Sequence, residues 1–482
     1  MPPAWERRHP PVRRGWQRSA IFAWGLFVVR RAWPLLLAVV GGAAPALLAA
    51  DFIVVPEAQT GVPVSLTDLS ADGSVVVGSS GFLSGQALRW TAKGGAQLLG
   101  DLQSPAIRSA ALAVSSDGKT IVGKGTADDS STAAFSWTST DGILPVWPLP
   151  PAQANDVTAY QATGVSSSGK VIVGQLEMGA NRQAFRWTEA DGVKLLGDLT
   201  GGATSSGATD VSADGQKLVG WATSAQGQQA AYWTPGTGFV SLGGLPGGAG
   251  TGFFPSLAQA ITPSGQAIVG QVDGPRGQEA FRWTAENGMV GLGDLAGGSF
   301  YSDAVGVSAD GRTIVGHSVV AGAGGVDRDA DYIWDPVRGM RPLLDVLVND
   351  YGLNAAKSLA GRPLNVRGIS DDGLTILGDN WIANLHGTFL PGDANFDGRV
   401  DLSDFGLLKA NFGSGRYRNQ GDFDGDGQVN LSDFGLLKAN FGKGGATAVP
   451  EPATGVSLLL GITLLLAVRL RRVGRQPHAD PR

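Results

Sequence analysis

Short stretches in which apolar and polar residues alternate dominate the chain between residues 61 and 390. Val and Ile alternate with small residues around Asp-Gly or Ser-Gly, pairs that favour a tight turn with positive φ. Helical periodicity is absent from this region, and the 73 glycines of the chain suit frequent turns. Each stretch therefore predicts a β-hairpin, and the hairpins lie at 69–78, 114–123, 165–174, 211–220, 261–270, 307–316 and 369–378.

A second stretch follows most of these hairpins and reads like Ala-Phe-Arg-Trp-Thr, a short turn and Leu-Gly-Asp-Leu. Its tryptophans recur roughly every 48 residues, a period typical of a propeller or a solenoid; they are Trp90, Trp137, Trp187, Trp233, Trp283 and Trp334. Two hairpins give four short strands, which make one propeller blade. We predict a mainly β fold with a seven-bladed β-propeller over residues 51–390. The last unit lacks its tryptophan half, so residues 52–55 would add its outer strand and close the ring.

The repeat resembles the HAF family of extracellular repeats found in secreted bacterial proteins. The resemblance rests on residues 183–187 and 279–283, which read Gln-Ala-Phe-Arg-Trp and Glu-Ala-Phe-Arg-Trp, and on Leu-Gly-Asp-Leu at 196–199 and 292–295. It implies an extracellular location and no known reaction. The family's leading His is Gln or Glu here, so no histidine-based role carries over.

Two twelve-residue loops near the C-terminus share one arrangement of oxygen-bearing side chains. These side chains stand at positions 1, 3, 5, 9 and 12, and Gly stands at position 6. This spacing is typical of a calcium loop, in which hard oxygen ligands converge and position 7 supplies a backbone carbonyl. The predicted ligands are Asp393, Asn395, Asp397, Arg399 (carbonyl), Asp401 (through water) and Asp404 for one ion, and Asp422, Asp424, Asp426, Gln428 (carbonyl), Asn430 and Asp433 for the other. The alternative is a pair of solvated acidic turns.

Nearly identical stretches, 401–413 and 430–442, follow the two loops. Their apolar residues recur at helical spacing, so we expect Phe405, Leu408 and Phe412 to pack on Phe434, Leu437 and Phe441. Ser403 and Ser432 are placed to cap the two helices. These loop–helix units resemble the repeats of type I dockerins, which places a small α-helical, dockerin-like module at 391–443. The resemblance implies calcium-dependent folding and docking to a cohesin module on another protein.

The two ends carry expected targeting segments. Residues 1–50 combine clustered arginines, an apolar run from Ala32 to Ala50 and small residues at its end, as a cleavable export signal does. An uncleaved N-terminal anchor is the alternative. Residues 444–482 contain Val-Pro-Glu-Pro at 449–452, a short apolar run and an arginine cluster. They resemble the PEP-CTERM sorting tail of Gram-negative bacteria, including planctomycetes, which implies cleavage by an exosortase at the inner membrane. An ordinary transmembrane helix that anchors the chain is the alternative there.

Composition narrows the possible chemistry. The chain has no cysteine, which excludes thiol catalysis, thiolate zinc sites and iron–sulfur clusters. The net charge is −5 although both ends are basic, so the body between them is strongly acidic and unsuited to nucleic acid. The histidines of the body, His317 and His386, are isolated in the sequence. The aspartates that recur in every repeat are expected to be structural, because an active site needs a unique constellation of residues.

The sequence thus predicts a secreted or cell-surface protein that binds without catalysis and carries a calcium-dependent docking module for two Ca²⁺ ions. Its expected partners are the export machinery and exosortase, a cohesin-like protein and extracellular polysaccharide. The alternative is a carbohydrate-active enzyme that degrades polysaccharide, because dockerins often accompany such enzymes. The repeated tryptophans leave the same choice open, since they can stack on sugars or pack between blades.

Mass spectrometry of the exported protein should show both ends removed, leaving a mature chain near residues 50 to 450. The reason is that each end carries a processing signal that export machinery reads and cleaves. An exported protein that keeps its C-terminal arginine cluster would contradict the sorting interpretation.

Overall fold

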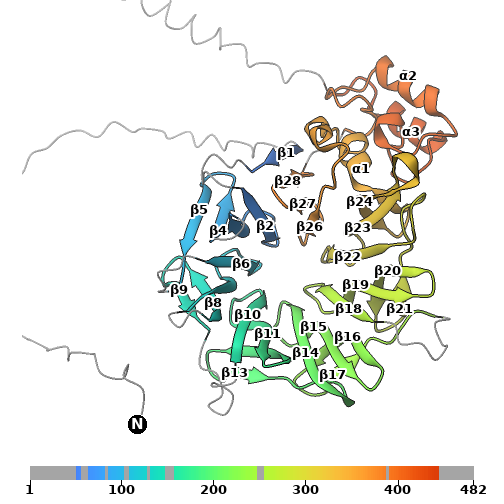
Figure 1. Ribbon diagram of the computed structural model, residues 1–482. Coiled ribbons are helices and arrows are strands. Elements are labelled where there is room, and N and C mark those ends of the chain that lie inside the picture. Colours follow the sequence, from blue (N-terminus) through green and yellow to red (C-terminus); the bar gives the residue numbers. More distant parts are fainter. Residues whose placement is uncertain are drawn as a thin grey trace, which may run out of the picture. The chain divides into compact units, whose positions relative to one another are not determined.

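A computed structural model describes residues 50–55, 63–81, 85–102, 108–127, 131–146, 157–246, 255–386 and 390–444. The chain up to residue 386 is built from short antiparallel strands, and residues 402–440 add two helices, as the sequence predicts (Figure 1). The expected export signal and sorting tail lie outside the described residues, except for Ala50 and Gly444. Within the described ranges, no helix is both long enough and apolar enough to cross a membrane.

The described strands form five separate four-stranded sheets and one eight-stranded sheet. In four of the four-stranded sheets the strands lie side by side in chain order. The first two of these sheets consist of β2 (Val64–Leu69), β3 (Val76–Ser80), β4 (Gln86–Thr91) and β5 (Gly95–Gly100), and of β14 (Gly201–Val211), β15 (Leu218–Ser224), β16 (Gly227–Thr234) and β17 (Gly238–Ser241). The other two consist of β18 (Ser256–Ile261), β19 (Ala267–Gly274), β20 (Gly277–Thr284) and β21 (Gly288–Gly291), and of β22 (Ser302–Val307), β23 (Ile314–Ala321), β24 (Asp327–Asp335) and β25 (Gly339–Pro342).

The fifth four-stranded sheet joins the two ends of the repeat region. Its strands are β26 (Val366–Ile369), β27 (Thr375–Gly378), β28 (Trp381–Asn384) and β1 (Asp51–Val54). β1 pairs antiparallel with β28, so the strand expected at 52–55 does complete the last sheet. The ring of Phe52 stacks on Trp381 with the two centroids 5.4 Å apart. The first strand of the chain therefore fastens the last repeat.

The eight-stranded sheet contains two antiparallel groups of four strands. The groups meet through a single parallel pair, Ala159 opposite Thr132. Its strands are β6 (Ser109–Val114), β7 (Ile121–Thr126), β8 (Thr132–Thr138), β9 (Gly142–Pro145), β10 (Val157–Val165), β11 (Val171–Met178), β12 (Asn181–Thr188) and β13 (Gly192–Leu195).

The sheets stand around a common centre, with the first strand of each group innermost (Figure 1). β2 contacts β6 on one side and β26 on the other, so the first and last groups are neighbours. The Asp371 N–H donates to the Ala71 carbonyl at 3.0 Å, and the Ala71 N–H donates to the Ser116 carbonyl at 3.2 Å. This arrangement is propeller-like, and the open solenoid that the period also allowed is not formed.

The Ser-x-Asp-Gly turn is what lets neighbouring groups approach. In the first turn the Ser70 hydroxyl donates to Asp72 Oδ1 at 2.8 Å, and the Ser74 N–H donates to the same oxygen at 3.0 Å. Gly73 has φ +66°, and a Cβ on it would lie 2.4 Å from the Thr375 side chain in the last sheet. Glycine is needed both for this backbone conformation and for the contact.

A second glycine recurs opposite a β-bulge. The pairing of β2 with β3 shifts register between Leu66 and Asp68, opposite Gly78. A Cβ on Gly78 would lie 2.1 Å from the Ser65 carbonyl oxygen, so no other residue fits there. The same shift recurs in the first strand pair of the other groups, which explains why Val-Val-Gly is repeated along the sequence.

Replacing Phe52 with Ala should lower the free energy of unfolding by about 3 kcal/mol, because the change removes a buried ring from the strand that closes the last sheet. Val54→Ala on the same strand is the matched control. Val54 is 47% exposed, and we expect a change of no more than about 0.5 kcal/mol there. Thermal and urea unfolding of both variants would measure the difference. Equal effects would show that β1 does not fasten the ring.

Candidate functional site

The first acidic loop folds around its own carboxylates. The N–H groups of Ala394 and Asp401 both donate to the Asp404 carboxylate, each at 2.8 Å, which ties the start of the loop to its end. Asp393 accepts from the N–H of Gly398 at 2.8 Å and from that of Asp397 at 3.2 Å. These bonds bring positions 1, 5 and 12 of the predicted ligand set together, although the first and last of them are eleven residues apart in the chain.

The second loop follows the same plan, except that Asp422 accepts from the N–H at position 4 where Asp393 accepts from the N–H at position 5. The N–H groups of Phe423 and Asn430 donate to Asp433 at 2.7 and 2.9 Å. Asp422 accepts from the N–H groups of Gly425 and Gly427 at 2.8 and 3.0 Å. Gly398 and Gly427, at position 6 of the two loops, have φ of 80° and 82°, which only glycine adopts without strain. The sharp turn predicted at this position is therefore present in both loops.

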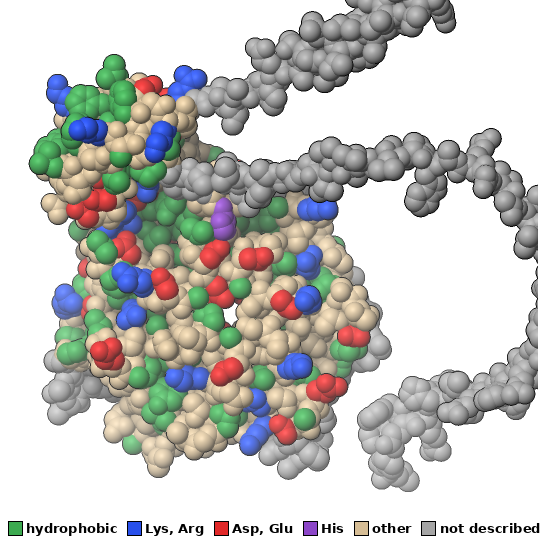
Figure 2. Space-filling view, turned by 180° about the vertical axis from the view of Figure 1, so that it is seen from behind, with side chains coloured by type: hydrophobic (Ala, Val, Ile, Leu, Met, Phe, Trp, Pro, Cys, Tyr) green, Lys and Arg blue, Asp and Glu red, His purple; other side chains and the backbone are tan. Residues whose placement is uncertain are grey.

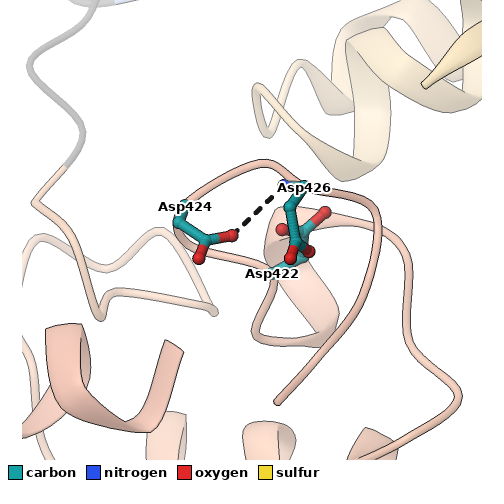
Figure 3. A group of neighbouring side chains, drawn as sticks. All are labelled: Asp422, Asp424 and Asp426. Carbon is teal, nitrogen blue, oxygen red and sulfur yellow. Dashed lines mark hydrogen bonds between the residues drawn. The ribbon is translucent and has the colours of Figure 1, made fainter. Parts of the chain in front are cut away.

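Carboxylates of the second loop converge on one point (Figure 3). Asp422, Asp424 and Asp426 each offer an oxygen, and these oxygens all lie within 4.8 Å of one another. The first loop has Asn395 in place of the second of these carboxylates, at position 3. Oxygen donors from carboxylates and amides are the ligands that Ca²⁺ takes. The donor set therefore fits calcium in both loops.

Without a bound cation, burying these carboxylates in their charged form is energetically unfavourable. Asp422 is 1% exposed and Asp433 is fully buried. Burial raises the pKa of Asp422 to about 6, and the charge of Asp433 adds to the rise. The pKa of Asp393 is also raised, first by burial and then by the neighbouring Asp404. A divalent cation between these groups would offset both the burial and the mutual repulsion.

The remaining predicted ligands lie at the exits of the loops. Arg399 and Gln428 stand at position 7, and their N–H groups donate to Asp397 and Asp426 at 2.9 and 2.8 Å. Asn430 at position 9 donates from Nδ2 to Asp426 at 3.3 Å, so it is drawn into the second loop.

The helices that follow are capped differently from the prediction. Helices α2 (Leu402–Asn411) and α3 (Leu431–Asn440) have Asp401 and Asn430 as N-caps, and each cap accepts from the serine N–H two residues on. The serine hydroxyls are not the capping groups. The carboxylates of Asp404 and Asp433 close a capping box with the N-cap backbone, so each of these carboxylates serves the loop and the helix at once.

The core of the module partly matches the expected pairing. Leu408 and Leu437 are buried, and the rings of Phe405 and Phe434 lie 6.0 Å apart. Phe412 and Phe441 were predicted wrongly, because they are about half exposed at 48% and 49%. Residues from the loops take their place, since the buried cluster consists of Ala394, Val400, Leu408, Phe423, Val429 and Leu437.

The centre of the ring is the other candidate site. A cavity of about 250 Å³ is lined by the innermost strands, and Figure 2 shows its opening. Burial raises the pKa of Asp68 to about 7 and that of Asp210 to about 6. Each carboxylate accepts a backbone N–H from a neighbouring group, from Val114 at 2.8 Å and from Ile261 at 2.9 Å. These acids therefore tie neighbouring groups together, which accounts for their burial.

His317 is not isolated as the sequence suggested. Its Nδ1 lies 2.8 Å from Asp303, and its Nε2 lies 3.8 Å from Asp331. Asp331 is buried and accepts the N–H groups of Leu364 and Val366 at 2.7 and 2.8 Å. Asp327 and Asp329, which alternate with Asp331 along the same strand, are exposed, whereas Asp331 is buried and binds backbone.

The repeated tryptophans are mainly packing residues. Trp90, Trp137 and Trp233 are each only 7% exposed and belong to the hydrophobic clusters between neighbouring sheets. Trp187, Trp283 and Trp334 are half-buried and pack against these and adjoining clusters. Packing is thus the better supported of the two roles that the sequence left open.

Comparison with known families agrees with this description of the C-terminal module. Residues 391–442 match the dockerin type I domain, which supports a calcium-dependent docking module at that place. A comparison with curated proteins finds no match to the chain.

Several solved structures show distant likenesses to the chain. A putative TolB from Agrobacterium tumefaciens is 16% identical, with 48% of this chain and 80% of that chain covered and a TM-score of 0.34. TolB from Acinetobacter baumannii is 14% identical, with coverages of 58% and 64% and a TM-score of 0.36. Hydrazine synthase of Kuenenia stuttgartiensis is 13% identical, with coverages of 65% and 92% and a TM-score of 0.38.

Calcium affinity of the second loop should fall once the pH drops below about 6, the pKa of Asp422. A proton then competes with the cation for this carboxylate, at a cost of about tenfold in affinity per pH unit. The stability of the ion-free module should instead increase as the pH falls. Because the folded pKa lies above the ordinary value of 3.8, its stability rises as the pH falls from about 6 towards 3.8.

Calorimetric calcium titrations between about pH 7.5 and pH 4.5 would measure this dependence, and Asp422→Asn is the control that removes the titrating group. An affinity that stays constant across the range would contradict a ligand role for Asp422.

Proposed function

We propose that this chain is an exported binding protein without catalytic activity, in which a β-propeller presents a ligand-binding surface and a dockerin-type module binds two Ca²⁺ ions. The observation that carries the proposal is the pair of acidic loops, each of which buries its first and last carboxylates, together with the convergence of three carboxylates in the second loop. The match of residues 391–442 to the dockerin type I domain supports it independently.

The propeller of the proposal has seven blades. Support comes from counting the eight-stranded sheet as two blades, since its two groups share only one parallel pair of residues. Each of the seven repeated turns also has its glycine at a φ between 66° and 73°; these are Gly73, Gly118, Gly169, Gly215, Gly265, Gly311 and Gly373. Equivalent turns in equivalent places are expected of equivalent blades.

The occupancy of each ion is proposed to stabilise the module strongly. Free calcium about a thousandfold above its dissociation constant would add about 4 kcal/mol per site. That is comparable with the whole stability of a small domain. The module is small, and its buried cluster consists of only six residues, so the ions would contribute a large share of its stability.

Lack of catalysis is proposed because the candidate acids already have structural partners. The turn aspartates are held by their own turns: the Ser212 hydroxyl and the Gln216 N–H lower the pKa of Asp214. The acids of the central cavity bind backbone N–H groups of neighbouring strands. His317 is enclosed by two carboxylates that pack within the sheets. Acidic and basic side chains are interspersed over the face in Figure 2, which does not favour nucleic acid as a partner.

The partners of the proposal are a cohesin-like protein for the module and extracellular polysaccharide for the propeller. Exported location at the cell surface fits the dockerin-type module, with exosortase acting on the C-terminal tail during maturation. Exposed apolar side chains on the module suit a protein partner: Leu402 and Leu431 are 74% and 75% exposed. Figure 2 shows apolar side chains gathered on this part of the molecule.

Calorimetry on the chain should report two bound Ca²⁺ ions. Asp393→Ala and Asp422→Ala should each reduce this to one, and the double variant should bind none, because each change removes the position 1 ligand of one loop. Asp191→Ala, an exposed aspartate of the propeller, is the control and should keep both ions. Unchanged binding in the double variant would contradict the proposed ligands.

Binding without turnover is tested by glycan-array binding alongside hydrolase assays on the same preparation. We expect retention of particular glycans and no release of reducing ends. Hydrolysis that disappears when a single propeller acid is replaced would instead establish the carbohydrate-active enzyme.

A further inference from the structure

A helical insertion interrupts the repeat between β25 and β26. Residues 343–365 contain helix α1 (Leu343–Asn349) and the short 3-10 helix η3 (Asn354–Leu359). Leu343, Val346 and Leu347 are buried against the propeller. Because the apolar side of α1 is anchored in this way, the insertion is part of the rigid ring, and its polar end is held in a fixed place.

That polar end contacts the calcium module. The Asp350 carboxylate accepts the Arg418 N–H at 3.1 Å, and Asn419 Nδ2 donates to Asn349 Oδ1 at 3.0 Å. Both module residues lie in the 3-10 helix η4 (Arg418–Gln420), which immediately precedes the second calcium loop. Tyr417 packs against the apolar cluster of the insertion. The connection between the two loops is therefore seated on α1.

Two arginines complete the contact and balance its charge. Arg338, just before β25, and Arg341, within it, both donate to Asp350, at 3.0 and 2.7 Å, and Arg341 also pairs with Asp335 at 3.2 Å. Asp350 and Asp335 thus pair with two guanidinium groups. Asp350 is only 5% exposed, and a buried ion pair of this kind is strongly destabilised when one partner leaves.

Both calcium loops touch this surface at the same loop position. In the second loop the Gly425 carbonyl accepts from Arg338 Nε at 2.5 Å. In the first loop the Phe396 ring lies beside Gly352, where an added Cβ would come within 2.9 Å of it. Both residues occupy position 4, between the ligands at positions 3 and 5, and both have positive φ, 75° and 59°. Their placement depends on the folded shape of the loops.

We infer that Arg338, Arg341 and residues 349–352 form a docking platform for the chain's own calcium module, and that calcium binding and docking stabilise each other. The inference rests on the proposed calcium binding and goes beyond it. Without the ions the loop carboxylates repel one another, and position 4 of each loop leaves the platform. By thermodynamic linkage, the factor by which calcium raises the equilibrium constant for docking equals the factor by which docking raises the affinity for calcium. In calcium the propeller and the module move as one body, and chelation separates them.

Hydrogen exchange on the full chain tests this directly. With calcium, the amides of 343–359 should exchange more slowly than in EDTA, by at least about tenfold, while the amides of β14 to β16 remain unchanged. Asp350→Asn should abolish the calcium dependence at 343–359, because it removes the negative charge that pairs with both arginines and leaves a single acceptor oxygen for three donors. Asp329→Asn, an exposed carboxylate on β24, is the matched control and should behave as the parent chain does.

Arg338→Gln is a second variant that removes the contact to Gly425 and leaves Asp350 paired with Arg341. It should reduce the calcium dependence at 343–359. Calorimetry on the same samples separates the two ideas. If calcium binds the parent chain and exchange at 343–359 does not change, the docking inference is overturned and the calcium proposal stands. If no calcium binds, both are overturned.

Discussion

The close approach of neighbouring innermost strands is the constraint on which the propeller depends. A ring of short sheets has room at its centre only if the backbone of each group can touch the next without side chains between them. The turn glycine provides that, as at Gly73 and Gly118, whereas the glycine opposite the bulge lets the two inner strands of one group pair closely. The contact between Gly73 and Thr375 shows the consequence most clearly, because it joins the first and last repeats. The Ser and Asp side chains of each turn then satisfy the backbone groups that this geometry exposes.

Aspartate has opposite roles in the two parts of the chain. In the propeller turns one carboxylate receives several N–H and hydroxyl donors, as Asp72 does from Ser70 and Ser74, so its charge is compensated locally. In the C-terminal loops several carboxylates share one small volume, and the backbone N–H groups are too few to compensate them. The same residue type is therefore a structural acceptor in the first case and, in the proposed function, a cation ligand in the second.

The insertion after β25 connects these two parts. Apolar residues anchor the insertion on the ring, and its Asp350 contacts the module. The module therefore attaches to the propeller at the repeat that departs from the common pattern. A dockerin-type module is expected to face a partner protein through exposed residues, and Leu402 and Leu431 remain exposed here. Docking of the module to the propeller would fix the orientation of a bound partner protein relative to the propeller.

The sequence by itself determined the period, the hairpins, the closing strand at 52–55 and the positions of the acidic loops. Each of these is a local pattern: alternation sets strands, Asp-Gly sets turns, and ligand spacing sets a calcium loop. The number of blades and of ions remains a prediction from the same patterns. Ser403 and Ser432 were expected as caps because the residue type suggested it. The helices instead begin earlier, because Asp401 and Asn430 are held by the carboxylates that close the loops.

Only the tertiary structure decided which residues from distant segments meet. Phe412 and Phe441 follow the helical pattern of a buried face, yet Phe423 and Val429 from the loops fill that core and leave them exposed. His317 acquires its two carboxylates from neighbouring strands, and Arg338 meets Gly425 across 87 residues of sequence. Such contacts follow from how the sheets, the insertion and the module pack, and periodicity along one segment carries no information about its neighbours in space.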